Sequence, residues 1–207
     1  MKSSGILDLD LLKSSLEECG HYIQRDVLPT SSLEKLTLLL KENIEADNFE
    51  QAGISRSLHQ TTNTKIRDSK TLWINDWSEF KEVEILLTDI MLTLNQHFFL
   101  SMKRFESQLA WYQPGGFYKK HIDVHKETRH RQVTTILFLN DCDQGGELVL
   151  YDREEINKIE KVITPEAGML VTFFSAQVFH EVLQTTKDRF SLTSWLRDDQ
   201  LLPFQPI

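Results

Sequence analysis

Residues 108–123 have the sequence QLAWYQPGGFYKKHID, in which a Pro-Gly-Gly turn joins two segments rich in aromatic and aliphatic side chains. This pattern is typical of two short antiparallel strands, because turn residues separate side chains that favour an extended backbone. Similar segments follow at short spacing. The predicted strands are 108–112, 117–123, 132–140, 147–151, 161–164, 169–174, 178–183 and 190–196. Eight short strands in this order favour a double-stranded β-helix, the jelly-roll or cupin-like fold, over alternating βαβ units.

The first half of the chain has helical periodicity instead. Apolar residues recur every three or four positions and predict helices over 7–19, 31–44 and 76–98. Ser31 and Asp76 are each followed three residues later by Glu, the spacing of a capping box. The interval 53–74 is polar, and we expect short strands there around a mobile loop at 59–63. The chain is thus predicted to be a single α+β domain with a helical support and substrate loop over 1–104, a jelly-roll core over 105–197 and a tail over 198–207.

Charge and composition exclude several classes of protein. The chain has 207 residues, 23 basic and 31 acidic side chains, a net charge of −8 and 40% hydrophobic residues. This composition is that of a globular protein, and the acidic balance argues against a nucleic-acid or membrane binder, since phosphate contacts need clustered Lys and Arg. Cys19 and Cys142 are too few for a disulfide scaffold. Because there is no signal-peptide pattern and no long apolar run, we expect a soluble cytoplasmic protein.

Two histidines and an aspartate form the strongest candidate metal site. His121 and Asp123 are two residues apart, so within one strand their side chains would point to the same face. The third candidate, His180, lies between apolar residues in a later predicted strand. Two imidazoles and one carboxylate are the ligand set of non-haem iron(II) oxygenases, which leaves metal positions open for a co-substrate and dioxygen. Taken singly, His121 and Asp123 are more typical of a surface His-Asp pair, and His180 is more typical of a core histidine, than of metal ligands.

Arg189 directly precedes the last predicted strand, 190–196. A turn at 185–188 is expected to fold this strand back beside the strand of His180, which would bring Arg189 next to the candidate metal site. A guanidinium buried there must find an anion. Because alternate residues of a strand share one face, Ser191, Thr193 and Trp195 would line the same cavity.

Together these motifs resemble a known enzyme family. Residues 51–197 resemble the Fe(II)- and 2-oxoglutarate-dependent dioxygenases, and specifically the prolyl hydroxylases of the hypoxia-sensing type and their bacterial relatives. The matching segments are 112–123, 133–140, 145–148, 165–168, 180–182 and 189–195, with a further match at 65–74. The resemblance implies a prolyl 4-hydroxylase type of reaction, in which a proline of a protein substrate is hydroxylated and 2-oxoglutarate is converted to succinate and CO2.

The resemblance also implies which residues bind the metal and the co-substrate. The implied iron(II) ligands are His121, Asp123 and His180. Arg189 is expected to bind the C5 carboxylate of 2-oxoglutarate, with Tyr112 and Thr193 near its C1 end. Dioxygen is the second co-substrate, and ascorbate is a candidate reductant.

On the substrate side, the resemblance implies that Arg131 and Trp195 face the polypeptide and that the polar loop before Ile66 folds over it. Two departures from the family pattern stand out. Phe138 occupies a position where the animal enzymes have a tyrosine whose hydroxyl helps to hold the C5 carboxylate, and Asp68-Ser69 replaces a Gly-Asp pair. The implied partner is a protein with a target proline, with no nucleic acid or membrane, and the enzyme is expected to be a monomer or homodimer.

Two alternatives remain from the residues alone. One keeps the iron site but oxidises a free amino acid or another small molecule. The other is a cupin-like binding or structural module, without catalysis, whose metal site is vestigial or holds zinc. Iron-dependent release of succinate would separate this module from both enzymes.

Overall fold

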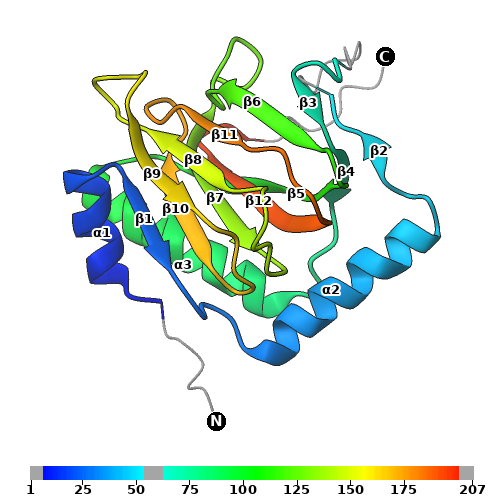
Figure 1. Ribbon diagram of the computed structural model, residues 1–207. Coiled ribbons are helices and arrows are strands. Elements are labelled where there is room, and N and C mark those ends of the chain that lie inside the picture. Colours follow the sequence, from blue (N-terminus) through cyan, green and yellow to red (C-terminus); the bar gives the residue numbers. More distant parts are fainter. Residues whose placement is uncertain (1–6, 54–62, 201–207) are drawn as a thin grey trace, which may run out of the picture.

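Two antiparallel β-sheets that face each other form the centre of the computed structural model, which describes residues 7–53 and 63–200 (Figure 1). The helices in this part of the chain are α1 (Leu9–Glu18), α2 (Thr30–Glu45) and α3 (Lys81–Phe98). The strands are β1 (His21–Gln24), β2 (Glu50–Gln51), β3 (Arg67–Asp68), β4 (Lys70–Ile74), β5 (Arg104–Tyr112), β6 (Phe117–His121), β7 (Arg131–Phe138), β8 (Leu148–Tyr151), β9 (Ile159–Ile163), β10 (Leu170–Phe174), β11 (His180–Val182) and β12 (Arg189–Arg197).

The sheet order confirms the predicted double-stranded β-helix. One sheet has seven strands in the order β1-β10-β7-β12-β5-β4-β2, and the other has five in the order β3-β6-β11-β8-β9. The eight predicted strands correspond to β5 through β12. From β5 to β12 the chain passes repeatedly from one sheet to the other, which is how this fold encloses a space between its sheets.

The expected pairing of the last strand is wrong. The turn at 185–188 does not lay β12 beside β11, because β12 pairs with β5 and β7 in the seven-stranded sheet, whereas β11 pairs with β6 and β8. The turn therefore carries the chain across to the opposite sheet. Arg189 reaches the cavity from the wall that faces His180, and not from a neighbouring strand.

The helix starts differ from the predicted ones. The carboxylate of Asp76 accepts a hydrogen bond from the Ser78 N–H (2.9 Å) and closes a turn, so α3 begins only at Lys81. Helix α2 begins at Thr30, one residue before the predicted start at Ser31, and no side chain caps it. Helix α1 begins after Asp8, whose side chain accepts from the Leu11 N–H. None of these described helices combines the length and apolar character that a membrane span requires.

The polar interval before α3 contains strands β3 and β4, in line with the expectation of short strands there, and β1 and β2 are strands that the sequence did not predict. Most of the loop expected at 59–63 lies outside the described residues, which omit 54–62.

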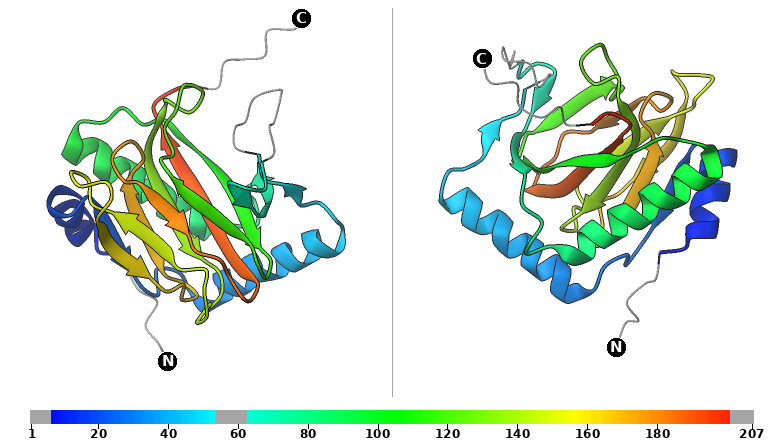
Figure 2. Two further views of the ribbon diagram at one scale, coloured as in Figure 1. Left: turned by 45° about the horizontal axis from the view of Figure 1, so that its top comes forward. Right: turned by 180° about the vertical axis from the view of Figure 1, so that it is seen from behind.

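Alternate residues of the large sheet divide the core into two parts. Leu109, Leu137 and Leu192 belong to one hydrophobic cluster with the buried faces of the helices. The view from behind in Figure 2 shows α2 and α3 on this side of the molecule. Ile136 and Phe138, one position away from Leu137, point inward to a second cluster between the sheets. The helices therefore stabilise one face of this sheet and leave its other face free to line a cavity.

A turn at Gly145 and Gly146 holds the end of β12 against the rest of the barrel. Both glycines have a left-handed backbone, and Gly145 forms an isolated bridge with Thr185. A Cβ atom on Gly145 would lie 2.3 Å from the carbonyl oxygen of Gln184. Only glycine therefore fits at this position without displacing backbone.

We predict that Gly145→Ala lowers the free energy of unfolding by roughly 3 to 4 kcal/mol, since overpacking is added to the strain of a left-handed alanine. Gly115→Ala is the control, because Gly115 also has a positive φ but its Cβ would meet nothing closer than 3.9 Å. It should cost only the backbone strain, about 1 to 2 kcal/mol. Urea unfolding of both variants measures the difference, and equal losses would contradict the role of the Gln184 contact.

Candidate active site

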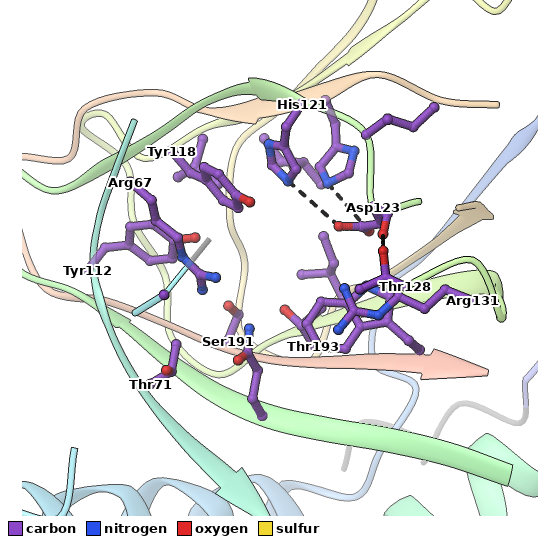
Figure 3. A pocket seen from close by; sticks show the side chains of 18 of the residues that line it. Arg67, Thr71, Tyr112, Tyr118, His121, Asp123, Thr128, Arg131, Ser191 and Thr193 are labelled. Carbon is purple, nitrogen blue, oxygen red and sulfur yellow. Dashed lines mark hydrogen bonds and ion pairs between the residues drawn. The ribbon is translucent and has the colours of Figure 1, made fainter. Parts of the chain in front are cut away.

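A cavity of about 200 Å³ lies between the two sheets (Figure 3). The side chains of all the site residues predicted from the sequence line this cavity: Tyr112, His121, Asp123, Arg131, His180, Arg189, Thr193 and Trp195. The two histidines come from the five-stranded sheet, and the two arginines from the seven-stranded sheet. The fold thus brings together residues that are up to 83 positions apart, Tyr112 and Trp195 being the outermost.

His121 and His180 are direct cross-strand partners in the pairing of β6 with β11. Each Nδ1 lies within hydrogen-bond distance of the carbonyl oxygen two residues earlier, Lys119 at 2.8 Å and Val178 at 3.1 Å. A neutral imidazole donates from Nδ1 in this arrangement, which leaves the Nε2 lone pair unprotonated. The two Nε2 atoms face Asp123, at 3.7 Å from its Oδ1 and Oδ2 respectively.

Asp123 lies beyond the end of β6, in a bend, so the expectation that it shares a strand with His121 is wrong. Hydrogen bonds from two threonines hold it instead. Thr134 Oγ1 donates to Oδ2 of Asp123 (2.7 Å), and Thr128 Oγ1 donates to its backbone carbonyl (2.7 Å). In this position one ligand atom from each of His121, Asp123 and His180 lies within 4.8 Å of the others, close enough to hold a metal ion.

The protonation states of the cluster suit a divalent cation. Burial, followed by the neighbouring His180, lowers the pKa of His121 to about 3, so its imidazole is neutral at pH 7. Burial raises the pKa of Asp123, but the two histidines, Arg131 and the Thr134 hydrogen bond outweigh it and hold the pKa below its usual range. A neutral imidazole and an ionised carboxylate are the forms that bind metals. The donor set therefore fits iron(II).

Arg189 is a buried cation that lines the cavity and forms no ion pair with a carboxylate of the described part of the chain. It is 1% exposed, its Nε donates to the Gly146 carbonyl (2.8 Å), and its Nη1 donates to Ser191 Oγ (3.3 Å). Among residues 7–53 and 63–200, Nη2 has no hydrogen-bond partner. The rings of Tyr112 and Phe138 lie about 5 Å from the guanidinium carbon, at 4.9 and 5.0 Å. Because an unpaired buried cation is costly, this site fits an anionic group.

The expected substrate side of the cavity is built around Arg131 and Trp195. The guanidinium carbon of Arg131 lies 3.6 Å from the centroid of the Trp195 ring. Glu106, behind them, accepts hydrogen bonds from Arg131 Nε (3.0 Å) and Arg197 Nη1 (2.8 Å). The ring of Trp73 packs against Trp195 with centroids 6.0 Å apart. This wall therefore combines flat aromatic surface with a fixed cation.

Several residues of the site were not predicted as site residues, although Tyr118 and Arg67 lie in the segments 112–123 and 65–74 that resemble the family. The Tyr118 ring stacks on His121, with centroids 3.5 Å apart, and the guanidinium carbon of Arg67 lies 4.7 Å from the Tyr118 ring. His125 also lines the cavity. Arg67 reaches the site because β3 pairs with β6 opposite Tyr118, a register that sequence patterns do not define. Thr134 is one of many polar residues in its strand, so only the fold shows its contact with Asp123.

Comparisons with known proteins agree with this geometry. Residues 107–197 match the model of the 2OG-Fe(II) oxygenase superfamily. Among curated proteins, no sequence is significantly similar to the chain. A crystal structure of a Pseudomonas putida prolyl-4-hydroxylase is similar, with 29% identity, a TM-score of 0.81, and coverage of 91% of this chain and 98% of that one.

Two further solved structures show how widely the fold is shared. A prolyl hydroxylase from Trichoplax adhaerens, in complex with a peptide fragment of the hypoxia inducible factor oxygen degradation domain, has 23% identity and a TM-score of 0.82 over 92% of this chain and 89% of that one. The alpha ketoglutarate dependent epimerase SnoN of nogalamycin biosynthesis has 11% identity and a TM-score of 0.69 over 92% and 82%. With its candidate metal-ligand cluster and its buried arginine in one cavity of this fold, the chain resembles the 2OG-Fe(II) oxygenases and, among them, the prolyl hydroxylases.

Proposed function

We propose that this oxygenase is a peptidyl-prolyl hydroxylase of the prolyl 4-hydroxylase type, which releases succinate and CO2. The observation that carries the proposal is the position of Arg189, which lines the same cavity as the His-Asp-His cluster and whose buried Nη2 has no hydrogen-bond partner among the described residues. A dicarboxylate that chelates a metal at one end and meets a cation at the other fits such a cavity. The similarity to a bacterial prolyl-4-hydroxylase favours proline as the oxidised residue.

In this proposal His121, Asp123 and His180 hold iron(II) on one wall. Bound iron(II) supplies the oxidative chemistry, the activation of dioxygen at the expense of 2-oxoglutarate. The chain contributes two neutral imidazoles oriented by the carbonyls of Lys119 and Val178, together with one ionised carboxylate. Three protein ligands leave the remaining positions for co-substrates.

The opposite wall binds the co-substrate. Arg189 binds the C5 carboxylate of 2-oxoglutarate, while Tyr112 and Thr193 lie toward its C1 end. Phe138 offers no hydroxyl, and Ser191 Oγ, already bonded to Arg189 Nη1, is the neighbouring polar group on β12. A buried guanidinium between two aromatic rings is poorly hydrated, which strengthens its attraction for the carboxylate.

The peptide meets Arg131 and Trp195. The ring of Trp195 offers a flat surface for a pyrrolidine ring, and Arg131 offers donors for a backbone carbonyl of the substrate. Glu106 holds this guanidinium in place, so the donors need no reorganisation when the peptide binds. The structure of a prolyl hydroxylase with a bound peptide supports a peptide substrate for this fold.

Mass spectrometry tests the proposal. The purified protein is incubated with iron(II), 2-oxoglutarate and air, together with host proteins, proline-containing peptides or free proline. We expect one added oxygen on a peptidyl proline, with equimolar succinate. Oxidation of free proline alone would favour the small-molecule alternative, and the absence of iron-dependent succinate with every substrate would contradict an oxygenase.

We predict that His180→Ala and Asp123→Ala each abolish succinate formation, because two protein ligands hold iron(II) weakly. Both variants should keep the circular dichroism spectrum of the wild type, since neither residue belongs to the hydrophobic core clusters. His97→Ala is a control, because His97 pairs with Glu17 on the helical side of the molecule. Retained activity in both ligand variants would refute the metal site.

We predict that Arg189→Ala raises the concentration of 2-oxoglutarate needed for half-maximal turnover. Loss of the charged contact should cost about 2 to 4 kcal/mol, or roughly 30- to 900-fold in concentration. Arg25→Ala is the control, since Arg25 forms an exposed ion pair with Glu166. Succinate release over a 2-oxoglutarate titration measures the effect, and an unchanged requirement would exclude Arg189 from this role.

A further inference from the structure

We propose that Thr134 is a positioning residue that selects which oxygen of Asp123 binds the metal. The inference rests on the proposed iron site and concerns a residue of the opposite sheet. Thr134 belongs to β7 of the seven-stranded sheet, whereas His121 and His180 belong to the five-stranded sheet. Its hydroxyl, which is fully buried, donates across the cavity wall to Oδ2 of Asp123 (2.7 Å).

Asp123 needs such a partner because strand pairing does not orient it. The histidine rings are set by the β6–β11 register, but Asp123 lies in the bend after β6. Thr128 binds only the backbone carbonyl of Asp123 (2.7 Å) and so leaves the carboxylate free to rotate. Thr134 is the residue whose hydrogen bond reaches the carboxylate itself.

A second hydroxyl gives this hydrogen bond its direction. Ser175 Oγ lies 2.7 Å from Thr134 Oγ1, and both residues are fully buried. A threonine hydroxyl has a single hydrogen, which Thr134 donates to Asp123, so Ser175 must donate to Thr134. The backbone of Ser175 is held in turn, since its N–H donates to the Gln132 carbonyl (3.0 Å). The result is an ordered chain of donors from Ser175 through Thr134 to Asp123.

This chain makes the two carboxylate oxygens unequal. Oδ2 accepts the Thr134 hydrogen bond, whereas Oδ1 accepts none from the residues that the structure describes. Oδ1 is therefore the oxygen that keeps its lone pairs for the metal. Binding through one oxygen occupies a single metal position, which keeps the others open for the co-substrates.

Thr172 provides a matched control in the neighbouring strand. It is also fully buried in the seven-stranded sheet, on β10, but its hydroxyl has no hydrogen-bond partner among the described residues. Thr→Val at either position keeps the side-chain shape and removes the hydroxyl. Only the change at position 134 also removes a bond to Asp123.

The test is a calorimetric titration of the metal-free protein with Mn(II), a redox-stable probe of the iron site. Thr134→Val should weaken Mn(II) binding by roughly 10- to 100-fold, the usual effect of losing a hydrogen-bond partner of a metal ligand. Thr134→Ser keeps the donor and should bind Mn(II) like the wild type, as should Thr172→Val. A purely structural role of Thr134 would lower the melting temperature of the metal-free protein without changing this affinity.

Equal Mn(II) affinity of folded Thr134→Val and wild type would overturn the inference and leave the proposed function intact. If Thr134→Val does not fold, Ser175→Ala takes its place, because it removes the donor to Thr134. It should weaken Mn(II) binding less than tenfold but measurably, and unchanged affinity would again overturn the inference. Failure of the wild type itself to bind Mn(II) would contradict the metal site of the proposed function, and the inference with it.

Discussion

The antiparallel pairing of β6 with β11 places His121 directly opposite His180, and the candidate active site depends on this register. Side chains alternate between the two faces of a strand, so a slip of one residue would turn one imidazole out of the cavity. The ring centroids lie 4.2 Å apart, and Tyr118 and Phe173 pack against the outer sides of the pair. Backbone pairing and ring packing thus bring the two nitrogen ligands together before any metal binds.

The two sheets contribute different groups to the candidate site. The five-stranded sheet supplies the imidazoles, and the seven-stranded sheet supplies the buried cations Arg131 and Arg189. Arg131 has a carboxylate partner in Glu106, whereas the partners of Arg189 within 7–53 and 63–200 are a carbonyl and a hydroxyl. A buried cation is stabilised mainly by a paired anion. The charge of Arg131 is paired in this way within the described residues, and the charge of Arg189 is not. This difference supports the proposal that Arg189 binds an anionic ligand.

Local sequence patterns predicted most of the helices and strands. The features that depend on which strands and side chains pair in the folded chain were not predicted. The eight strands of the β-helix and the residues lining its cavity follow from turn residues, strand periodicity and motif resemblance. Three expectations were wrong for one reason: the start of α3, the placement of Asp123 in a strand and the pairing of β12 beside β11. Each depends on which of several possible hydrogen-bond partners a group takes in the folded chain. Asp76 binds the Ser78 N–H, Asp123 binds the Thr134 hydroxyl, and β12 pairs with β5 and β7. Sequence periodicity contains no information about such choices. Arg67 and Tyr118 were missed likewise, because the pairing of β3 with β6 creates their contact.

The aromatic residue at position 138 has a physical consequence for the proposed co-substrate site. Phe138 is fully buried, and its ring faces Arg189 without offering a hydrogen-bond donor. A carboxylate bound there would gain most of its stabilisation from the guanidinium and little from neighbouring hydroxyls. The Gly146 carbonyl accepts from Nε and Ser191 Oγ accepts from Nη1, so Nη2 is the nitrogen without a hydrogen-bond partner among the described residues. The site would then distinguish ligands by the charge of the group bound at Arg189 and by the distance from Arg189 to the metal cluster. In the proposed site a dicarboxylate would therefore be recognised by its charge at Arg189 and by its reach to the metal cluster, because strand pairing fixes Arg189 in one sheet and His121 and His180 in the other.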